Sequence, residues 1–145
     1  MTKIVAVAAV GQNGVIGLNG RLPWPAQDGE IPLFQEVTLG GALIVGARTI
    51  ASLPKRLDLG DRRLWTWYGY KEGHEGPIAL IERVARCDPG RTIFICGGGA
   101  TYAAFAKYTN ELIITRVNYS GPGDKWFPWA EFAALRAQSA GASRT

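Results

Sequence analysis

The chain has 145 residues, which suits one domain with one hydrophobic core and leaves no room for two domains of ordinary size. Hydrophobic residues make up 47% and charged residues 19%, a balance too apolar for a disordered chain, and no apolar run approaches the roughly 20 residues of a membrane-spanning helix. The net charge is +4, but the Lys and Arg residues stand singly or in pairs, so the charge favours a small anionic ligand over a nucleic-acid backbone.

Predicted strands and helices alternate along the chain. Branched and aromatic residues predict strands at 4–10, 42–45, 64–68, 92–96 and 111–118. Helical spacing predicts helices at 31–38, 48–53, 78–87 and 101–107. This alternation predicts an α/β fold with helices packed on the faces of a sheet. We expect a single domain over residues 1–136 and a flexible tail over residues 137–145, which are rich in Ala, Ser and Gly.

The N-terminal apolar run and the cysteines both favour a cytoplasmic protein. Residues 4–10 lead into Gly11 rather than into a small-residue cleavage site, so they predict a strand and not a signal peptide. Cys87 and Cys96 lie nine positions apart, without metal-ligand or redox-motif spacing, and His74 is the one histidine. We therefore expect free thiols, no metal site and no catalytic triad.

Two junctions between a strand and a helix have the form of phosphate cradles. The strand at 92–96 ends at Gly97-Gly98-Gly99, where bare backbone amides precede a helix. The strand at 42–45 ends at Gly46-Ala47-Arg48-Thr49, which adds a guanidinium and a hydroxyl that can bond phosphate oxygens. Two cradles predict a bound diphosphate, as in a dinucleotide. The alternative is that the glycines only permit tight turns, and their spacing is not the G-x-G-x-x-G of an ordinary Rossmann domain.

A carboxylate near residue 30 is a candidate catalytic group. Pro32 fits a helix only in the first turn, which places Glu30 near the start of that helix. With Ile31 and Phe34 on the inward side, Glu30 could face an apolar cleft, where burial raises its pKa and the helix end lowers it. The alternative is a solvated Glu at a helix N-terminus, and the residues by themselves favour that alternative.

Together these segments resemble the dihydrofolate reductase family from about Lys3 to Pro128. The opening strand with Leu22-Pro23-Trp24 resembles the family's first strand and mobile loop. The family's acid, pocket aromatic and helix threonine correspond in spacing to Glu30, Phe34 and Thr38. Later landmarks that match are Thr115 and the segment from Gly123-Asp124 to Phe127-Pro128. The resemblance implies a central mixed, mostly parallel sheet flanked by helices, and a cis peptide bond between Gly97 and Gly98.

The resemblance also implies an activity, the reduction of 7,8-dihydrofolate to 5,6,7,8-tetrahydrofolate by hydride transfer from NADPH. This reaction serves one-carbon and thymidylate metabolism. Glu30 would hold the pterin and favour protonation of its N5 through a water, while Leu22 and Trp24 would belong to the closing loop. The implied substrate-binding residues are Ala9, Ile31, Phe34, Arg62, Cys96 and Thr115. The implied cofactor-binding residues are Val10, Ile16, Gly17, Asn19, Gly46, Ala47, Arg48, Thr49, Tyr68, Gly97, Gly98, Gly99, Ala100, Thr101 and Tyr102.

Several positions depart from the family pattern. At the site for the cofactor's 2′-phosphate, Ala47 precedes Arg48, and Tyr68-Gly69 replace the usual small polar or basic residues, so a preference for NADPH over NADH does not follow. After residues 131–137 the chain lacks the long terminal hairpin, so the last strand is expected to be missing. Its absence would expose the edge of the strand at 111–118 and predicts a homodimer across that edge, or poor solubility.

Two alternative functions remain open. One is reduction of another pterin-like or ribosylamino-pyrimidine substrate. The other is a non-catalytic nucleotide-binding or structural relative, which would bind the cofactor without turnover. Nucleic-acid binding is not expected, because Trp65 and Trp67 alternate as strand core rather than lining a basic groove.

Overall fold

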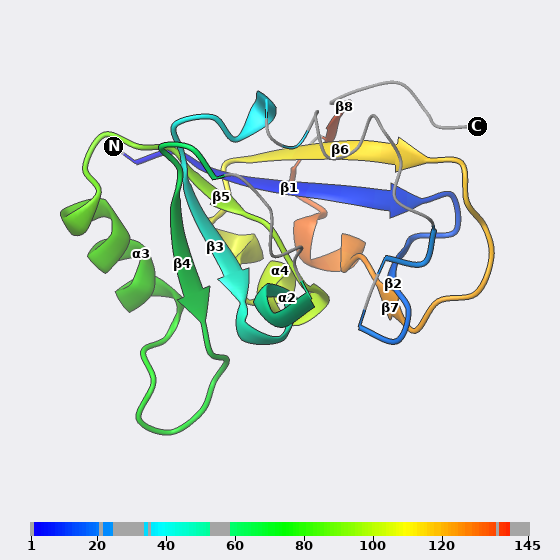
Figure 1. Cartoon of the computed structure of the whole chain (residues 1–145), viewed down its shortest axis with the longest axis horizontal. Coiled ribbons are helices and arrows are strands. Elements are labelled where there is room, and N and C mark those ends of the chain that lie inside the picture. The colour runs from blue at the N-terminus through cyan, green and yellow to red at the C-terminus, as the bar shows by residue number, and fades with distance from the viewer. Residues whose placement is uncertain are drawn as a thin grey trace.

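A six-stranded sheet runs through the molecule, and every neighbouring pair of strands in it is parallel (Figure 1). The computed structural model describes residues 2–20, 22–24, 34, 36–52, 59–135 and 137–139. In strand order, the sheet consists of β4 (Arg63–Trp67), β3 (Ala42–Gly46), β5 (Ile93–Ile95), β1 (Ile4–Gly11), β6 (Glu111–Val117) and β8 (Ala137–Ser139).

The remaining elements are short. A separate antiparallel pair joins β2 (Val15–Gly17) to β7 (Lys125–Trp126). The helices are α2 (Ala47–Ser52), α3 (Pro77–Cys87) and α4 (Gly99–Phe105), with 3₁₀ turns η1 (Ala106–Tyr108) and η2 (Trp129–Phe132). Among the described residues, helical conformation also occurs at Phe34, Glu36 and Val37.

Helices cover both faces of the sheet, which is why the central strands are apolar throughout. Successive residues of a strand point to opposite faces. Accordingly, Ile4 and Ala6 of β1 belong to a core cluster with α3 and α4, whereas Val5 and Val7 belong to a second cluster against which Phe34 packs. Strands buried on both faces form continuous hydrophobic runs, and this is the pattern that the sequence shows.

Helix α3 shows how local sequence and packing agree. Pro77 is its first residue, where a missing N–H costs no hydrogen bond. Leu80 and Val84, four residues apart, are fully buried against the sheet. The sequence thus accounts both for the residue at which α3 begins and for the face that it buries.

The predicted α/β fold with a mostly parallel sheet is confirmed. All five predicted strands are present within one or two residues of their expected ends, and so are the helices predicted at 48–53, 78–87 and 101–107. Most of the helix predicted at 31–38 lies outside the described residues. The sequence pattern did not predict β2, β7, β8 or η2, because elements of two to four residues are too short to show a periodicity.

The expected loss of the last strand needs correction. Ala137, Gln138 and Ser139 form β8, which pairs in parallel with Leu112–Ile114 of β6. Part of the sequence assigned to a flexible tail is thus a strand, and it covers a portion of the edge that was expected to be open. Residues 140–145 lie outside the described residues. The premise of a dimer across a fully open edge is weakened accordingly, and the domain limits of 1–136 stay a prediction.

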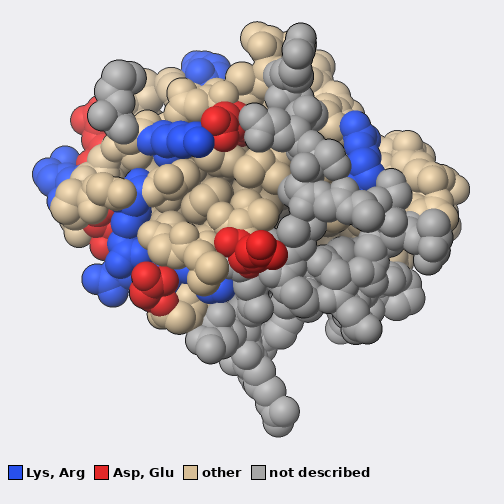
Figure 2. Space-filling view, turned by 90° about the horizontal axis from the view of Figure 1, so that it is seen from above, with Lys and Arg blue, Asp and Glu red and all other residues tan. Residues whose placement is uncertain are grey.

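Three further features concern the surface charge, the cysteines and the length of the helices. On the face that Figure 2 shows, Lys and Arg side chains are interspersed with Asp and Glu, and the described residues form no continuous basic stripe there. Cys87 and Cys96 are free thiols, as expected. No helix within the described ranges is long and apolar enough to cross a membrane.

Candidate active site

The two glycine segments meet at the carboxyl edge of the sheet. Gly46 ends β3 and Gly97 follows β5, and these two strands are parallel neighbours. The backbone N–H of Gly46 donates to the carbonyl of Gly97 at 2.7 Å. In open parallel sheets, ligands bind outside the carboxyl ends of the strands. The two predicted phosphate cradles therefore lie together, where one ligand can reach both.

Side-chain hydroxyls crowd the bare backbone of this junction. A Cβ on Gly46 would lie 2.6 Å from Thr101 Oγ1, and a Cβ on Gly98 would lie 3.0 Å from Thr49 Oγ1. The peptide bond between Gly97 and Gly98 is cis, as the family resemblance implies. Backbone amides and two threonine side chains thus lie together at this junction, and amides and hydroxyls are the groups that bind an anionic diphosphate.

Tyr102, which is buried, and Cys96, which is partly buried, lie next to the glycine segment as neutral groups. The Tyr102 hydroxyl donates to the carbonyl of Val7 at 2.7 Å. Burial raises the pKa of the Tyr102 phenol, with a smaller contribution from Cys96, and burial also raises the pKa of the Cys96 thiol. Both groups stay protonated at neutral pH, so neither is a nucleophile or a general base there.

Strand β2 lies beside the glycine junction, and its end is hydrogen-bonded to the chain before β7. A Cβ on Gly99 would contact Ile16 at 3.8 Å. The N–H of Asp124 donates to the carbonyl of Gly17 at 2.9 Å, and the N–H of Asn19 donates to Asp124 Oδ2 at 3.0 Å. The sequence pattern did not predict that Asp124 would bond to residues 17 and 19.

Several expected substrate-site residues gather around the ends of β1 and β6. Ala9 pairs with Thr115 in the register of these strands. Trp24 is 4% exposed and packs with Val15 in a small cluster that Ala9 also contacts. Leu22 is 49% exposed, which leaves it available to a ligand. The structure thus brings Ala9, Thr115 and Trp24 together.

On the opposite face, Arg62 is anchored to the helical segment that contains Phe34. Arg62 is buried, and its Nε donates to Thr38 Oγ1 at 3.3 Å while its Nη1 donates to the carbonyl of Leu59 at 3.1 Å. Thr38 in turn donates to the carbonyl of Phe34 at 2.8 Å. Arg62 therefore helps to position this segment. Glu30 and Ile31, the expected acid and its neighbour, lie outside the described residues.

The remaining candidate cofactor-binding residues differ in how exposed their side chains are. Arg48 and Ala100 are exposed at the starts of α2 and α4, and Tyr68 is 52% exposed and stacks on His74 with ring centroids 5.1 Å apart. Val10 is fully buried in the core, so only its backbone could reach a ligand. Within the described ranges, no group of three or more His, Cys, Asp or Glu could hold a metal ion.

Comparison with known proteins identifies the family. The sequence model described as "Dihydrofolate reductase" matches residues 3–144, nearly the whole chain. The chain belongs to the dihydrofolate reductase family. It is therefore an oxidoreductase of that family, which agrees with the cis Gly97–Gly98 bond and the glycine junction.

Members of the dihydrofolate reductase family with two different substrates in their names are similar to this chain. A dihydromethanopterin reductase from Methylorubrum extorquens is 37% identical over 94% of this chain and 100% of its own length. A dihydrofolate reductase type 8 from Escherichia coli is 38% identical over 90% of this chain and 83% of its own length. A dihydrofolate reductase from Neisseria meningitidis is 30% identical over 88% of this chain and 80% of its own length.

Proposed function

We propose that this protein reduces a 7,8-dihydropterin to the tetrahydropterin with NADPH. The observation that carries the proposal is the joined glycine junction of β3 and β5 in a member of this family. The relatives named above share a reduced pterin as substrate, whether dihydrofolate or dihydromethanopterin. The individual roles are also proposals: catalysis for Glu30, cofactor binding for Arg48 and substrate binding for Thr115.

The residues at the carboxyl edge fit a dinucleotide cofactor. Gly46 and Gly98 lie where a side chain would collide with Thr101 and Thr49, so bare backbone lets the two segments and the two threonines meet at this edge. We assign the cofactor diphosphate to these two glycines, with Thr49 and Thr101 as hydroxyl donors and Arg48 as the nearby cation. When bound, the nicotinamide supplies a hydride, so the protein needs no nucleophile of its own.

The chain's own residues orient the substrate and exclude water. Trp24 holds its loop against β1 and β6 by packing, and Leu22 remains exposed at the end of the same segment. Closure of such a loop keeps bulk water away from the transferring hydride. We assign to Glu30 the binding of the pterin amino group and the protonation of N5 through a water, because a carboxylate can accept two hydrogen bonds at once.

The substrate's tail decides between the two named pterins. Arg62 is the residue that dihydrofolate would need for its glutamate carboxylate, and its side chain is buried with bonds to Thr38 and Leu59. Dihydromethanopterin is favoured by the relative whose full length this chain covers. We retain both as substrates to test, and we place the protein in the cytoplasm, where free thiols persist.

The test is NADPH oxidation by the purified protein with 7,8-dihydrofolate and, in parallel, with dihydromethanopterin. We expect turnover with at least one of them and a loss of about 100-fold or more in Glu30→Gln, because that variant keeps the side-chain size but removes the anion. Glu36→Gln is the matched control, since Glu36 is an exposed carboxylate six positions further along the chain. Cofactor binding without turnover on either pterin would instead indicate the non-catalytic relative.

A further inference from the structure

Strand β4 is an open end of the sheet. Of the described strands it pairs only with β3, and Figure 1 shows no further strand on its outer side. The strand at the opposite end, β8, has three residues, whereas β4 has five. Strand edges pair readily with another extended chain, because their N–H and C=O groups lack partners. The outer edge of β4 is therefore a candidate interaction surface.

The hydrogen-bonding groups of β4 alternate between its two sides. The N–H of Arg63 donates to the carbonyl of Gly41 at 3.0 Å, on the side of β3. Because neighbouring residues of an extended strand direct these groups to opposite sides, Leu64, Thr66 and the following Tyr68 direct theirs outward. Within the described part of the chain, no backbone hydrogen bond reaches Leu64 or Thr66 from that outer side. The edge thus offers a row of donors and acceptors to a partner strand.

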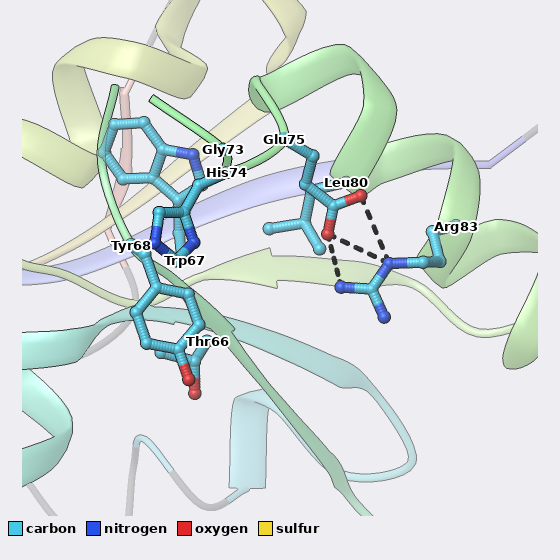
Figure 3. Close-up of a pocket in the computed structure, with 8 residues that line it drawn as sticks. All are labelled: Thr66, Trp67, Tyr68, Gly73, His74, Glu75, Leu80 and Arg83. Atoms are coloured by element: carbon cyan, nitrogen blue, oxygen red, sulfur yellow. Dashed lines mark hydrogen bonds and ion pairs between the residues drawn. The ribbon is translucent and has the colours of Figure 1, made fainter. Parts of the chain in front are cut away.

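The exposed apolar side chains of this edge are placed symmetrically about Thr66. Leu64 is 39% exposed and Tyr68 is 52% exposed, and each lies two positions from Thr66. Side chains two positions apart lie on the same face of a strand, and Figure 3 shows Thr66 and Tyr68 on one side of β4 with Trp67 on the other. A two-fold axis at Thr66 would set Leu64 of one copy against Tyr68 of the other, and the two side chains would cover each other.

The charges beside the strand fit the same antiparallel arrangement. Asp61 lies five positions before Thr66 and Lys71 five positions after it, and both are exposed. A two-fold axis at Thr66 would bring the end of the edge that carries Asp61 beside the end that carries Lys71 in the other copy. The Glu75 carboxylate nearby already accepts hydrogen bonds from Arg83 at 2.9 and 3.2 Å, so its charge is compensated within the chain (Figure 3). The edge is therefore complementary to itself in charge.

We propose that two copies of this chain pair through β4, antiparallel and about a two-fold axis at Thr66, so that one sheet runs through both copies. The partner is a second copy rather than another extended chain, because the backbone groups, the apolar side chains and the charges all match themselves in one register. In this register Leu64 faces Tyr68 and Thr66 faces Thr66, and these pairs exchange backbone hydrogen bonds. The pairing does not depend on the proposed reductase activity, and none of its tests requires turnover.

The first test measures the mass of the protein in solution. Size-exclusion chromatography with light scattering should give twice the mass of one chain at high micromolar concentration. Leu64→Lys should give the mass of one chain, because a charged side chain on an edge strand opposes pairing. Ile78→Lys is the matched control, since Ile78 is 51% exposed on α3 and does not belong to the edge. A wild type with the mass of one chain, or a Leu64→Lys variant as dimeric as Ile78→Lys, would overturn the proposal.

A disulfide tests the register directly. Thr66 faces itself at the two-fold axis, so Thr66→Cys should form a covalent dimer under mild oxidation, in a Cys87→Ser background that removes an exposed thiol. Leu64→Cys in the same background is the control. The two copies of residue 64 would lie four positions apart along the paired strands, or about 14 Å, beyond the limit of roughly 7 Å for a disulfide. Equal cross-linking of the two variants, or none in either, contradicts this pairing.

Exchange of the two charges separates this pairing from association through another face. Asp61→Lys and Lys71→Asp each place like charges together, and each should raise the dissociation constant of the dimer about three- to tenfold, since the contact occurs twice in a dimer. The double variant restores opposite charges and should return the constant to near that of the wild type. A double variant that associates no better than the single variants speaks against the antiparallel register.

Amide hydrogen exchange identifies any other occupant of the edge. The N–H groups of Leu64 and Thr66 should be protected in the dimer and should lose that protection when dilution separates the copies. Protection that persists in single chains would mean that another segment of the same chain covers β4, and the proposal would then be wrong.

Discussion

Gly46 is the residue on which the junction of the two glycine segments depends most directly. Its N–H bonds the carbonyl of Gly97, and any side chain at this position would meet the hydroxyl of Thr101. The absence of a Cβ therefore permits the close approach of β3 to the segment after β5, which brings the two glycine segments together.

We predict that Gly46→Ala weakens both the fold and cofactor binding. The added Cβ would lie 2.6 Å from Thr101 Oγ1, so the two segments must separate. Overpacking of this kind costs about 1–3 kcal/mol of the free energy of unfolding. Thermal unfolding gives the stability, and titration with NADPH gives the dissociation constant, which should rise.

Gly76→Ala is the matched control for this variant. A Cβ on Gly76 meets nothing within 4 Å, and Gly76 does not have a positive φ. Gly76 is the N-cap of α3, where Ala is a poorer cap than Gly, so we expect the melting temperature to fall slightly while the affinity for NADPH stays near that of the wild type. If Gly46→Ala behaved like Gly76→Ala in both measurements, the glycine junction would not be the cofactor site.

At the scale of elements, the ion pair between Glu75 and Arg83 joins the loop after β4 to α3. Glu75 lies just before α3, and Arg83 lies two turns into it. Hydrogen bonds from Arg83 lower the pKa of Glu75 below its ordinary value of 4.5, and partial desolvation opposes this effect. Because the folded state lowers this pKa, the pair stabilises the fold when Glu75 is ionised, and the stabilisation is lost as the pH falls through the lowered value.

We predict that Glu75→Gln lowers the melting temperature at neutral pH and has a diminishing effect in acid. A partly exposed ion pair contributes about 1 kcal/mol or less, or roughly 3 °C in a chain of this size. The difference from the wild type should hold above pH 4.5 and shrink below it. Glu72→Gln, at an exposed position of the same loop, is the control. A difference that persisted unchanged in acid would contradict the role of the ion pair.

At the scale of the whole molecule, β8 decides how the sheet ends. Its three residues pair with Leu112–Ile114 and provide backbone partners to a strand that would otherwise be a sheet edge. Exposed edges of this kind template pairing with other chains. The short strand β8 therefore covers part of the edge of β6.

We predict that removal of residues 137–145 promotes self-association. The deletion takes away β8 and leaves the N–H and C=O groups of β6 unpaired on that side. Size-exclusion chromatography with light scattering should show a smaller oligomer for the full chain than for the truncated one. Identical masses for the two proteins would show that β8 does not protect the edge.

The central strands and the glycine junction were predictable because their causes are local. A strand buried on both faces must be apolar at nearly every position, as β1 and β3 are. A close approach of two backbones requires glycine, as at Gly46 and Gly98. The site residues found together, Ala9 with Thr115 and Thr49 with Gly98, are those that follow from these strands and glycines.

The sequence by itself determined the alternation of elements, the family and the places where the backbone had to stay bare. Only the tertiary structure decided that Arg62 is buried against Thr38, that Asp124 bonds to residues 17 and 19 and that β8 pairs with β6. It also decided that Trp67 Nε1 has no hydrogen-bond partner among the described residues. The physical reason is the distance along the chain: apolar patterns and glycines reflect what one segment needs, whereas these contacts join residues 20 or more positions apart or depend on what several elements leave unoccupied.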